Sequence, residues 1–352
     1  MKILTVLGAR PQFIKAAPVS RVLREKHTEL IIHTGQHYDA NMSDIFFEEL
    51  HIPKPDYLLG VGSGNHGKQT GEMLQKIEEI VLKEEPDYLM VYGDTNSTLA
   101  GALVAAKLHV PVIHIEAGLR SFNKRMPEEI NRIMTDHVSE YLFCPTDTAI
   151  KNLTDENITR NVYNIGDVMY DAVLYNRGLA EEKSDVLTVN GLEKKGFHLI
   201  TIHRAENTDD VENMKNILEA FSKIETMKVW PIHPRTKNKL ASYGLDIADI
   251  PNLKVIEPVG YLDMLTLEAN AEKIITDSGG VQKEAYFMKV PCVTIREQTE
   301  WVETLEEDAN ILAGTSVEKI LAGINKEVSP SYRELFGDGE ASKRIVELIE
   351  NR

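Results

Sequence analysis

The sequence has few cysteines and no long apolar run, and each shortage excludes a class of protein. Its 352 residues include two cysteines, Cys144 and Cys292, each inside an apolar run, so we expect buried reduced thiols and not a disulfide framework. No run approaches the roughly 18 apolar residues of a membrane-spanning helix, and the N-terminus lacks the features of a signal peptide. We therefore expect a cytoplasmic protein with no membrane partner.

Positive charge and cofactor motifs are also scarce. The chain has 39 Lys and Arg against 55 Asp and Glu, a net charge of −16, which opposes binding to nucleic acid or anionic lipid. The metal motif HExxH and carboxylate-rich cation loops are absent, so no metal site is expected. The motifs GxGxxG and GxxxxGK[ST] are absent too, which argues against a dinucleotide or P-loop site.

What the sequence does contain is a regular alternation of short apolar runs and amphipathic helical patterns, repeated about every 25 to 30 residues as in βαβ units. Strands are expected at 3–7, 30–34, 88–92, 112–115, 141–144 and 162–165, and then at 198–202, 228–232, 253–256, 273–276 and 292–295. Each half therefore predicts its own doubly wound parallel sheet in an α/β fold.

The length also predicts two domains, because one ordinary domain has roughly 100 to 200 residues. We place them at 1–168 and 169–337, with a C-terminal helix within 338–352 that packs back on the first. The polar stretch 181–195 lacks clear periodicity and is expected to be an irregular surface excursion.

Polar residues gather just after the expected strands, where ligands bind in open parallel sheets. They are Arg10, Lys15, Asp94, Glu116, His203, Arg204, Glu206, His233, Arg235 and Ser278. Chance placement would scatter these residue types along the chain. We therefore expect a polar site at the carboxyl ends of the strands.

The segment DSGGVQKE, residues 277–284, favours a phosphate group. Ser278 is a natural helix N-cap, and Gly279 and Gly280 let the backbone approach a ligand at the positive end of the helix dipole. Glu284 can accept hydrogen bonds from ribose hydroxyls. A capped helix with no ligand is the alternative.

The segment GARPQFIK, residues 8–15, also follows a strand. Arg10 and Lys15 place two cations beside a helix whose first turn holds Pro11, which favours a diphosphate. A solvated loop is the alternative.

Three carboxylates and a histidine complete the candidate site. Asp94 follows a strand, although a helix cap also explains it. Glu116 ends a buried strand, where a carboxylate is costly unless it is used or paired, for example with Arg120. Glu128, in PEEINR, is also explained by a helix start, whereas His203 lies in the polar cluster TIHRAEN. Acids, a histidine and a phosphate pocket suit proton chemistry on a nucleotide-activated substrate.

These motifs, in this order, closely resemble the non-hydrolysing UDP-N-acetylglucosamine 2-epimerase family over essentially the whole chain. The matching stretches are GARPQFIKAAP, HTGQHYD, VYGDTNSTLAGALVAAKL, IEAGLRSF with PEEINR, TIHRAEN, HPRT, DSGGVQKEA and REQTEWVE. The resemblance implies a GT-B fold, meaning two Rossmann-like domains with the active site between them. It also implies a homodimer, a UDP-sugar substrate and no metal or nicotinamide cofactor.

In that family, carbon 2 of the sugar loses its proton while UDP leaves anti, and UDP re-adds to the resulting 2-acetamidoglucal after reprotonation on the other face. The resemblance makes Asp94, Glu116 and Glu128 the acid/base candidates, with His203 as their partner. It assigns the substrate-binding roles to Arg10, Lys15, Ser278 and Gly279 for the diphosphate, Gly280 for the turn, Glu284 for the ribose, His233 near the nucleotide and Arg296 on the sugar side.

Several alternatives stay open at this point. Within the family, three segments are more similar to enzymes of surface-polysaccharide pathways, including those acting on UDP-2,3-diacetamido-2,3-dideoxy-glucuronate. They are HYDANMSDIFFEELHIPKPDY, HGKQTG and TEWVE. A hydrolysing 2-epimerase, a GT-B glycosyltransferase and a non-catalytic nucleotide-sugar sensor are other possibilities. Some family members bind a second UDP-N-acetylglucosamine through a Gln-His-Arg stretch; here Gln36-His37 is followed by Tyr38, which argues against that site.

Overall fold

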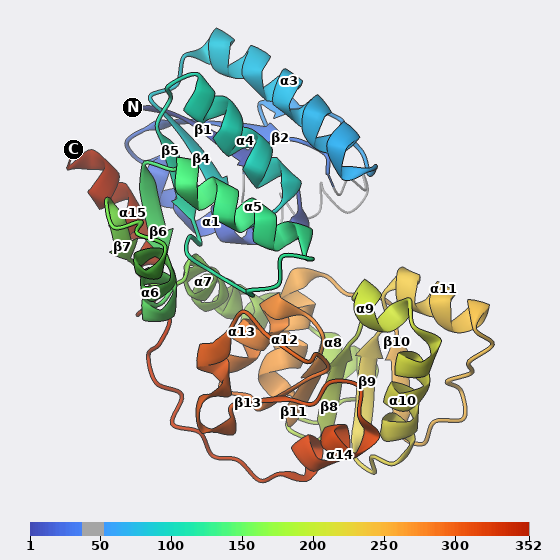
Figure 1. Cartoon of the computed structure of the whole chain (residues 1–352). Coiled ribbons are helices and arrows are strands. Elements are labelled where there is room, and N and C mark those ends of the chain that lie inside the picture. Colours follow the sequence, from blue (N-terminus) through green and yellow to red (C-terminus); the bar gives the residue numbers. More distant parts are fainter. Residues whose placement is uncertain (37–52, 352) are drawn as a thin grey trace. The chain divides into compact units, whose positions relative to one another are not determined.

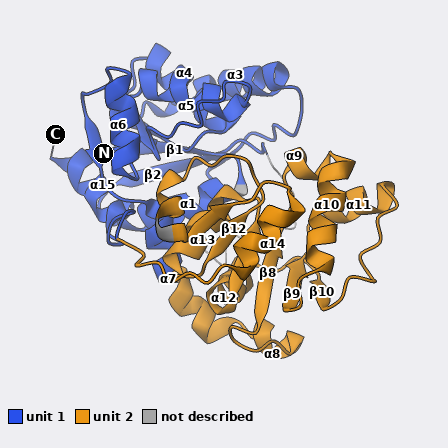
Figure 2. Cartoon of the chain, turned by 60° about the horizontal axis from the view of Figure 1, so that its bottom comes forward, with its two compact units in different colours: residues 1–174, 334–352 blue, residues 175–333 orange. Residues whose placement is uncertain are grey.

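The computed structural model describes residues 1–36 and 53–351, which form two compact units (Figures 1 and 2). Unit 1 comprises residues 1–174 and 334–352, and unit 2 comprises 175–333. The chain passes from one to the other within helix α7 (Val168–Lys183). Each unit has its own parallel sheet and its own core.

Unit 1 has a parallel sheet of the order β3-β2-β1-β4-β5-β6-β7. The strands are β1 (Lys2–Leu7), β2 (Thr28–His33), β3 (Tyr57–Leu58), β4 (Tyr88–Tyr92), β5 (Val112–Ile115), β6 (Tyr141–Cys144) and β7 (Val162–Asn164). The strand order reverses between β1 and β4, which makes their carboxyl ends a topological switch point, the usual ligand position in such sheets.

Helices cover both faces of this sheet (Figure 1). They are α1 (Arg10–Leu23), α3 (His66–Glu84), α4 (Asn96–Lys107), α5 (Pro127–Val138), α6 (Asp147–Asp155) and α15 (Ala341–Glu350). The inner strands are buried and mostly apolar because both of their faces are covered, and Thr5 and His114 are buried polar residues within them. The core on one side includes Leu4, Val6, Met73, Ile77 and Val91.

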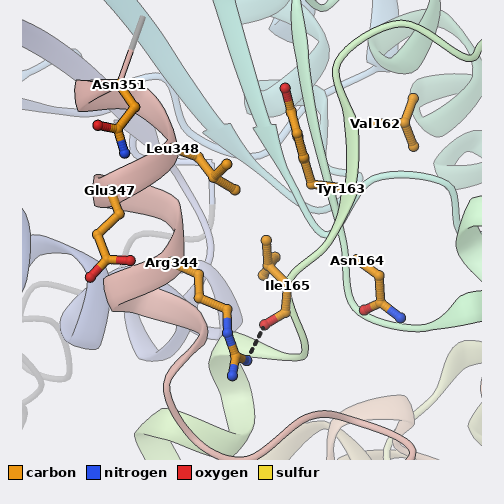
Figure 3. A pocket seen from close by; sticks show the side chains of 8 residues that line it. All are labelled: Val162, Tyr163, Asn164, Ile165, Arg344, Glu347, Leu348 and Asn351. Atoms are coloured by element: carbon orange, nitrogen blue, oxygen red, sulfur yellow. Dashed lines mark hydrogen bonds between the residues drawn. The ribbon is translucent and has the colours of Figure 1, made fainter.

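The C-terminal helix α15 belongs to unit 1, where it packs against α1. The buried Asp171 carboxylate accepts hydrogen bonds from the first amides of α15, Ala341 N at 3.2 Å and Ser342 N at 2.7 Å. Burial raises the pKa of Asp171, although these two hydrogen bonds oppose the rise. A pocket of about 450 Å³ lies between α15 and the edge strand β7, where Arg344 donates to the Ile165 carbonyl at 3.2 Å (Figure 3).

Unit 2 has a second parallel sheet, of the order β10-β9-β8-β11-β12-β13. Its strands are β8 (Phe197–Thr201), β9 (Met227–Pro231), β10 (Leu253–Ile256), β11 (Lys273–Thr276), β12 (Cys292–Thr294) and β13 (Asn310–Leu312). Its helices are α8 (Val186–Asn190), α9 (Ala205–Thr208), α10 (Val211–Ser222), α11 (Pro234–Ser242), α12 (Tyr261–Asn270), α13 (Gly279–Phe287), α14 (Val317–Asn325) and the 3-10 helix η1 (Val302–Asp308). Ile200, Phe221, Trp230 and Ile275 lie in its core.

The α/β prediction with two doubly wound parallel sheets is confirmed, and every expected strand is present within one or two residues of its position. Both cysteines are buried and form no disulfide. Among the described residues, every helix is too short or too polar to cross a lipid bilayer.

Two parts of the fold differ from expectation. Strands β3 and β13 were not expected, because two or three residues are too few to show an alternating pattern. The prediction of an irregular excursion at 181–195 is wrong. That stretch contains the end of α7 and all of α8, and Val186 and Leu192 bury their side chains in a core cluster of unit 2.

Candidate functional site

The loops after β1 and β4 are joined by one side chain, Gln12 of α1. Its carbonyl oxygen accepts the amides of Gly8 at 2.8 Å and Ala9 at 3.0 Å, and its amide nitrogen donates to the Tyr92 carbonyl at 2.8 Å. Gln12 is 2% exposed, so these bonds are shielded from water. The switch point of unit 1 is therefore a fixed backbone frame. Arg10 begins α1 at this frame, and Lys15 follows one turn later.

Glu116 directly follows β5 and forms an ion pair with Lys15. Both side chains are largely buried, at 5% and 14% exposure. Glu116 has φ 70°, a left-handed conformation that costs a non-glycine residue about 1 to 3 kcal/mol and that persists only where the surrounding structure holds it. Gly93 makes room for the pair, since a Cβ there would lie 3.1 Å from Glu116 Oε2. The alternative pairing of Glu116 with Arg120 is wrong, because Arg120 binds Asp136 and Glu156 instead.

Asp94 follows β4, and its carboxylate is 32% exposed. Arg132 of α5 binds Asp94 Oδ2 through Nε at 3.0 Å and through a second guanidinium nitrogen at 2.7 Å. Asn131 donates to the Asp94 carbonyl at 2.9 Å. Asp94 is thus a partly exposed carboxylate held by a buried cation, and it is not the residue that caps α4, because Thr95 caps that helix.

Glu128 and Glu129 share the first turn of α5 but have opposite environments. Glu128 is exposed. Glu129 is 1% exposed and accepts hydrogen bonds from the amides of Ser121 at 2.9 Å and Phe122 at 2.8 Å, and from Arg132 at 2.6 Å. Burial opposes its ionisation, but these bonds outweigh burial and lower the pKa of Glu129. Within unit 1, Glu129 is the structural carboxylate and Glu128 remains available to solvent.

In unit 2, the loop after β8 is held by a buried carboxylate at the end of β11, Asp277. It accepts the His203 amide at 3.1 Å, the Arg204 amide at 2.9 Å and the Asn207 side chain at 3.0 Å. The His203 ring stays 44% exposed, with Nδ1 3.6 Å from Asp277 Oδ1. It lies 6.2 Å, centre to centre, from the ring of His233, which caps α11. Asp277 therefore fixes the backbone of His203 and leaves its ring accessible.

The start of α13 has the predicted capping geometry, with Ser278 Oγ accepting the Val281 amide at 3.4 Å. A carboxylate lies beside it, because a Cβ on Gly279 would be 2.6 Å from Glu300 Oε1. Arg296 donates a hydrogen bond to Glu300 at 3.1 Å. The space beside Gly280 is open, because a Cβ there would meet only Ser278 Oγ, at 3.8 Å. The Glu300 carboxylate therefore lies beside the N-terminus of α13, where the positive end of the helix dipole favours a negative charge.

Glu284, further along α13, is 5% exposed and accepts a hydrogen bond from the Tyr261 hydroxyl at 3.1 Å. The completely buried Glu268 carboxyl lies close to it. Burial, and next the charge of Glu284, raise the pKa of Glu268 well above its usual value. Burial and the neighbouring carboxylate therefore favour the neutral form of Glu268.

Comparison with known proteins decides the family. A family model described as UDP-N-acetylglucosamine 2-epimerase matches residues 21–350. The chain belongs to the UDP-N-acetylglucosamine 2-epimerase family. A UDP-N-acetylglucosamine 2-epimerase homolog of Methanococcus maripaludis is 56% identical over all of both chains. The UDP-2,3-diacetamido-2,3-dideoxy-D-glucuronate 2-epimerase of Pseudomonas aeruginosa is 51% identical over 99% of both chains.

A solved structure gives the same result. The UDP-GlcNAc 2-epimerase of Methanocaldococcus jannaschii, in complex with UDP-GlcNAc and UDP, superposes with a TM-score of 0.92 at 47% identity over the full length of both chains. The expected GT-B fold of this family is confirmed.

Sequence reasoning missed several residues that hold the candidate site in place. They are Gln12, Glu129, Arg132, His114 and Asp136 in unit 1, and Asp277 and Glu300 in unit 2. A signal existed for some of them, since Asp277 opens the motif DSGG and His114 lies two residues before Glu116. Nothing in the sequence marks Asp136, because an acid in the middle of an amphipathic helix usually faces solvent.

One prediction cannot be placed. His37 and Tyr38, of the stretch Gln36-His37-Tyr38, lie outside the described residues, although Gln36 accepts the Ser97 amide at 3.0 Å. Within residues 1–36 and 53–351, no three His, Cys, Asp or Glu side chains are grouped closely enough to hold a metal ion.

Proposed function

We propose that this chain interconverts UDP-N-acetylglucosamine and UDP-N-acetylmannosamine as a non-hydrolysing 2-epimerase, an isomerase. In the forward direction a carboxylate takes the proton from carbon 2. The electrons of that C–H bond form the C1=C2 double bond of a 2-acetamidoglucal, and the C1–O bond to UDP breaks. Reprotonation of carbon 2 on the other face, with re-addition of UDP to carbon 1, completes the reaction.

The observation that carries this proposal is the pair of cation-held carboxylates at the switch point of unit 1. Glu116 beside Lys15 and Asp94 beside Arg132 are carboxyl groups fixed in position by a cation, and proton transfer to or from carbon 2 requires groups fixed in this way. Glu128 is the third candidate acid/base carboxylate. Which of the three takes the first proton is left open by the proposal.

The residues of unit 2 suit the leaving group. We propose that Ser278, Gly279 and Gly280 bind the diphosphate through the backbone at the start of α13, joined by Arg10 and Lys15. Glu284 receives the ribose, His233 lies near the nucleotide, and Arg296 contacts the sugar. The exposed ring of His203 supplies a proton or a hydrogen bond to the acid/base carboxylates.

A second substrate is the alternative, supported by one relative. The relative named for UDP-2,3-diacetamido-2,3-dideoxy-D-glucuronate is 51% identical, between the UDP-N-acetylglucosamine 2-epimerase homolog of Methanococcus maripaludis at 56% and the Methanocaldococcus jannaschii UDP-N-acetylglucosamine epimerase at 47%. The same elimination on that nucleotide is therefore the alternative. A homodimer in the cytoplasm and a part in making surface-polysaccharide precursors complete the proposal, and rest on the sequence resemblance.

The test is incubation with UDP-N-acetylglucosamine in D₂O, with carbon 2 followed by NMR. We expect deuterium at carbon 2 and UDP still attached to both epimers. Free N-acetylmannosamine with free UDP would instead identify a hydrolysing enzyme, and sugar transfer only on addition of an acceptor would identify a glycosyltransferase. If neither this nucleotide nor the diacetamido-glucuronate nucleotide exchanges, the proposed reaction is wrong.

A further inference from the structure

A buried histidine, His114, connects the two loops that carry the proposed acid/base carboxylates. It lies on β5, two residues before Glu116, and is completely buried. Its Nε2 lies 2.8 Å from the carbonyl oxygen of Gly93, the residue directly before Asp94. One ring on β5 thus contacts the backbone that leads into the neighbouring carboxylate.

Its partner is Asp136 of α5, which is equally buried. Asp136 Oδ1 lies 2.7 Å from His114 Nδ1, and Asp136 Oδ2 accepts the amide of Gly118, two residues after Glu116, at 3.2 Å. The carboxylate and the ring therefore hold the backbone after Glu116 and before Asp94. A single connected network reaches both carboxylate loops.

The contacts also constrain the hydrogen bonding of this pair. A carbonyl and a carboxylate are acceptors, so each ring nitrogen of His114 is placed to donate a hydrogen bond. The negative charge of Asp136 is shared with Arg120, whose NH1 lies 2.7 Å from Oδ2 and which also forms a two-bond pair with Glu156. Burial opposes the ionisation of Asp136, but His114 and Arg120 outweigh it and lower its pKa.

Other charged and titratable groups surround the network. Lys15 and Glu116 form a separate ion pair, and the buried Cys144 thiol lies near Asp136, where burial and that carboxylate raise the pKa of the thiol. Arg120 bridges the two carboxylates of the network, Asp136 and Glu156. The negative charge of Asp136 is therefore compensated within unit 1.

The network adjoins Glu116, whose backbone has a left-handed φ of 70°. Such a conformation is costly for a non-glycine residue and persists only where neighbouring contacts hold it. We propose that His114 and Asp136 are positioning residues of the epimerase reaction, which hold the Asp94 and Glu116 loops through the Gly93 carbonyl and the Gly118 amide. The inference rests on the proposed function. In this proposal neither residue touches the substrate, and each acts by positioning the carboxylates. A displacement of a reacting group by about 1 Å can slow a reaction about 100-fold.

The test compares H114L, which has no donor, with H114Q, whose amide keeps one donor at the reach of Nε2 for the Gly93 carbonyl. The matched control is H198L, because His198 is an equally buried histidine on a central strand, β8, of the other unit. We expect kcat of H114L to fall about 10- to 100-fold with KM and the Kd of UDP within about twofold of wild type. H114Q should recover most of kcat, and H198L should keep wild-type kcat.

Several outcomes would overturn the positioning role alone, provided that the wild type is active. They are a wild-type kcat in H114L, an equal loss in H198L, no recovery in H114Q, or a loss in H114L that lies in KM. Should H114L fail to fold, D136N takes its place with the same expected loss, because it removes the charge that holds the ring. An inactive wild type would instead overturn the proposed function.

A second measurement needs no turnover. In the wild type, ¹⁵N NMR of the His114 ring is expected to show both nitrogens protonated at neutral pH. A neutral ring would contradict the network even in an active enzyme.

Discussion

The two units prepare their candidate residues in opposite ways. In unit 1 two of the three candidate carboxylates are buried or half-buried and held by a cation, Glu116 by Lys15 and Asp94 by Arg132, whereas Glu128 is exposed. In unit 2 the candidate groups that face solvent are the half-exposed ring of His203 and the backbone at the start of α13, beside the buried Glu284 and Arg296. A buried charge needs permanent compensation, whereas backbone amides hold an anion without a charge of their own. Unit 1 is therefore suited to proton chemistry and unit 2 to binding and releasing a charged leaving group.

The largest expected effect comes from removing the charge of a buried carboxylate of unit 1. E116Q keeps the size of the side chain but removes the charge, so C2 deuterium exchange should slow by about 100-fold or more. The matched control is E29Q, since Glu29 is also a buried, ion-paired acid of the same sheet, bound by Arg24 at 2.8 Å and by Thr5 at 2.7 Å. E29Q should lose stability but keep kcat. Equal rates for E116Q and wild type would remove Glu116 from the chemistry.

Next in size is the contrast between adjacent acids of α5. E129Q should lower the free energy of unfolding by about 2 to 4 kcal/mol at pH 7, because it disrupts a buried, fully bonded carboxylate, whereas E128Q should leave stability unchanged. The pKa of Glu129 is lowered in the folded state, so its contribution is present above about pH 4.3, the usual value for Glu, and is lost as the pH falls further.

Urea unfolding at pH 7 and at lower pH measures both effects. The gap between wild type and E129Q should narrow with acid. If E128Q proves as unstable as E129Q, the separation of a structural from a functional acid is wrong.

A smaller effect tests whether the start of α13 in unit 2 binds the nucleotide. Ser278 and Ser316 cap α13 and α14 with the same geometry, their Oγ accepting amides at 3.4 Å and 3.3 Å. S278A and S316A should each cost about 1 kcal/mol of stability. Only S278A should also weaken UDP binding, by several-fold in calorimetry. Equal UDP affinities in the two variants would contradict a nucleotide site at α13.

The smallest effect concerns the carboxylate beside Gly279. E300Q removes a negative charge from the start of α13, where it repels an incoming phosphate, so UDP should bind about 2- to 5-fold more tightly. The gain should shrink at high salt, which screens the repulsion. Weaker binding in E300Q would show that Glu300 instead helps to hold the ligand.

Much of this protein was predictable from local pattern. Apolar runs between turn residues predict the strands of both sheets, since a strand covered on both faces is mostly apolar. Ser278 was recognised as a cap because capping depends on the next three residues. Three elements are not predictable in this way, because their stability comes from neighbours distant in sequence. They are the very short strands β3 and β13 and the helix α8 inside a polar stretch.

The sequence by itself determined the fold class, the family and the residue types gathered at the strand ends, because those depend on periodicity and on motifs read in order. Only the tertiary structure decided the partners: Lys15 rather than Arg120 for Glu116, the burial of Glu129 rather than Glu128, and the place of His114 between Gly93 and Asp136. Such pairings join residues up to about a hundred positions apart. A charge buried by folding takes the partner that the packed elements bring to it, which no local pattern records.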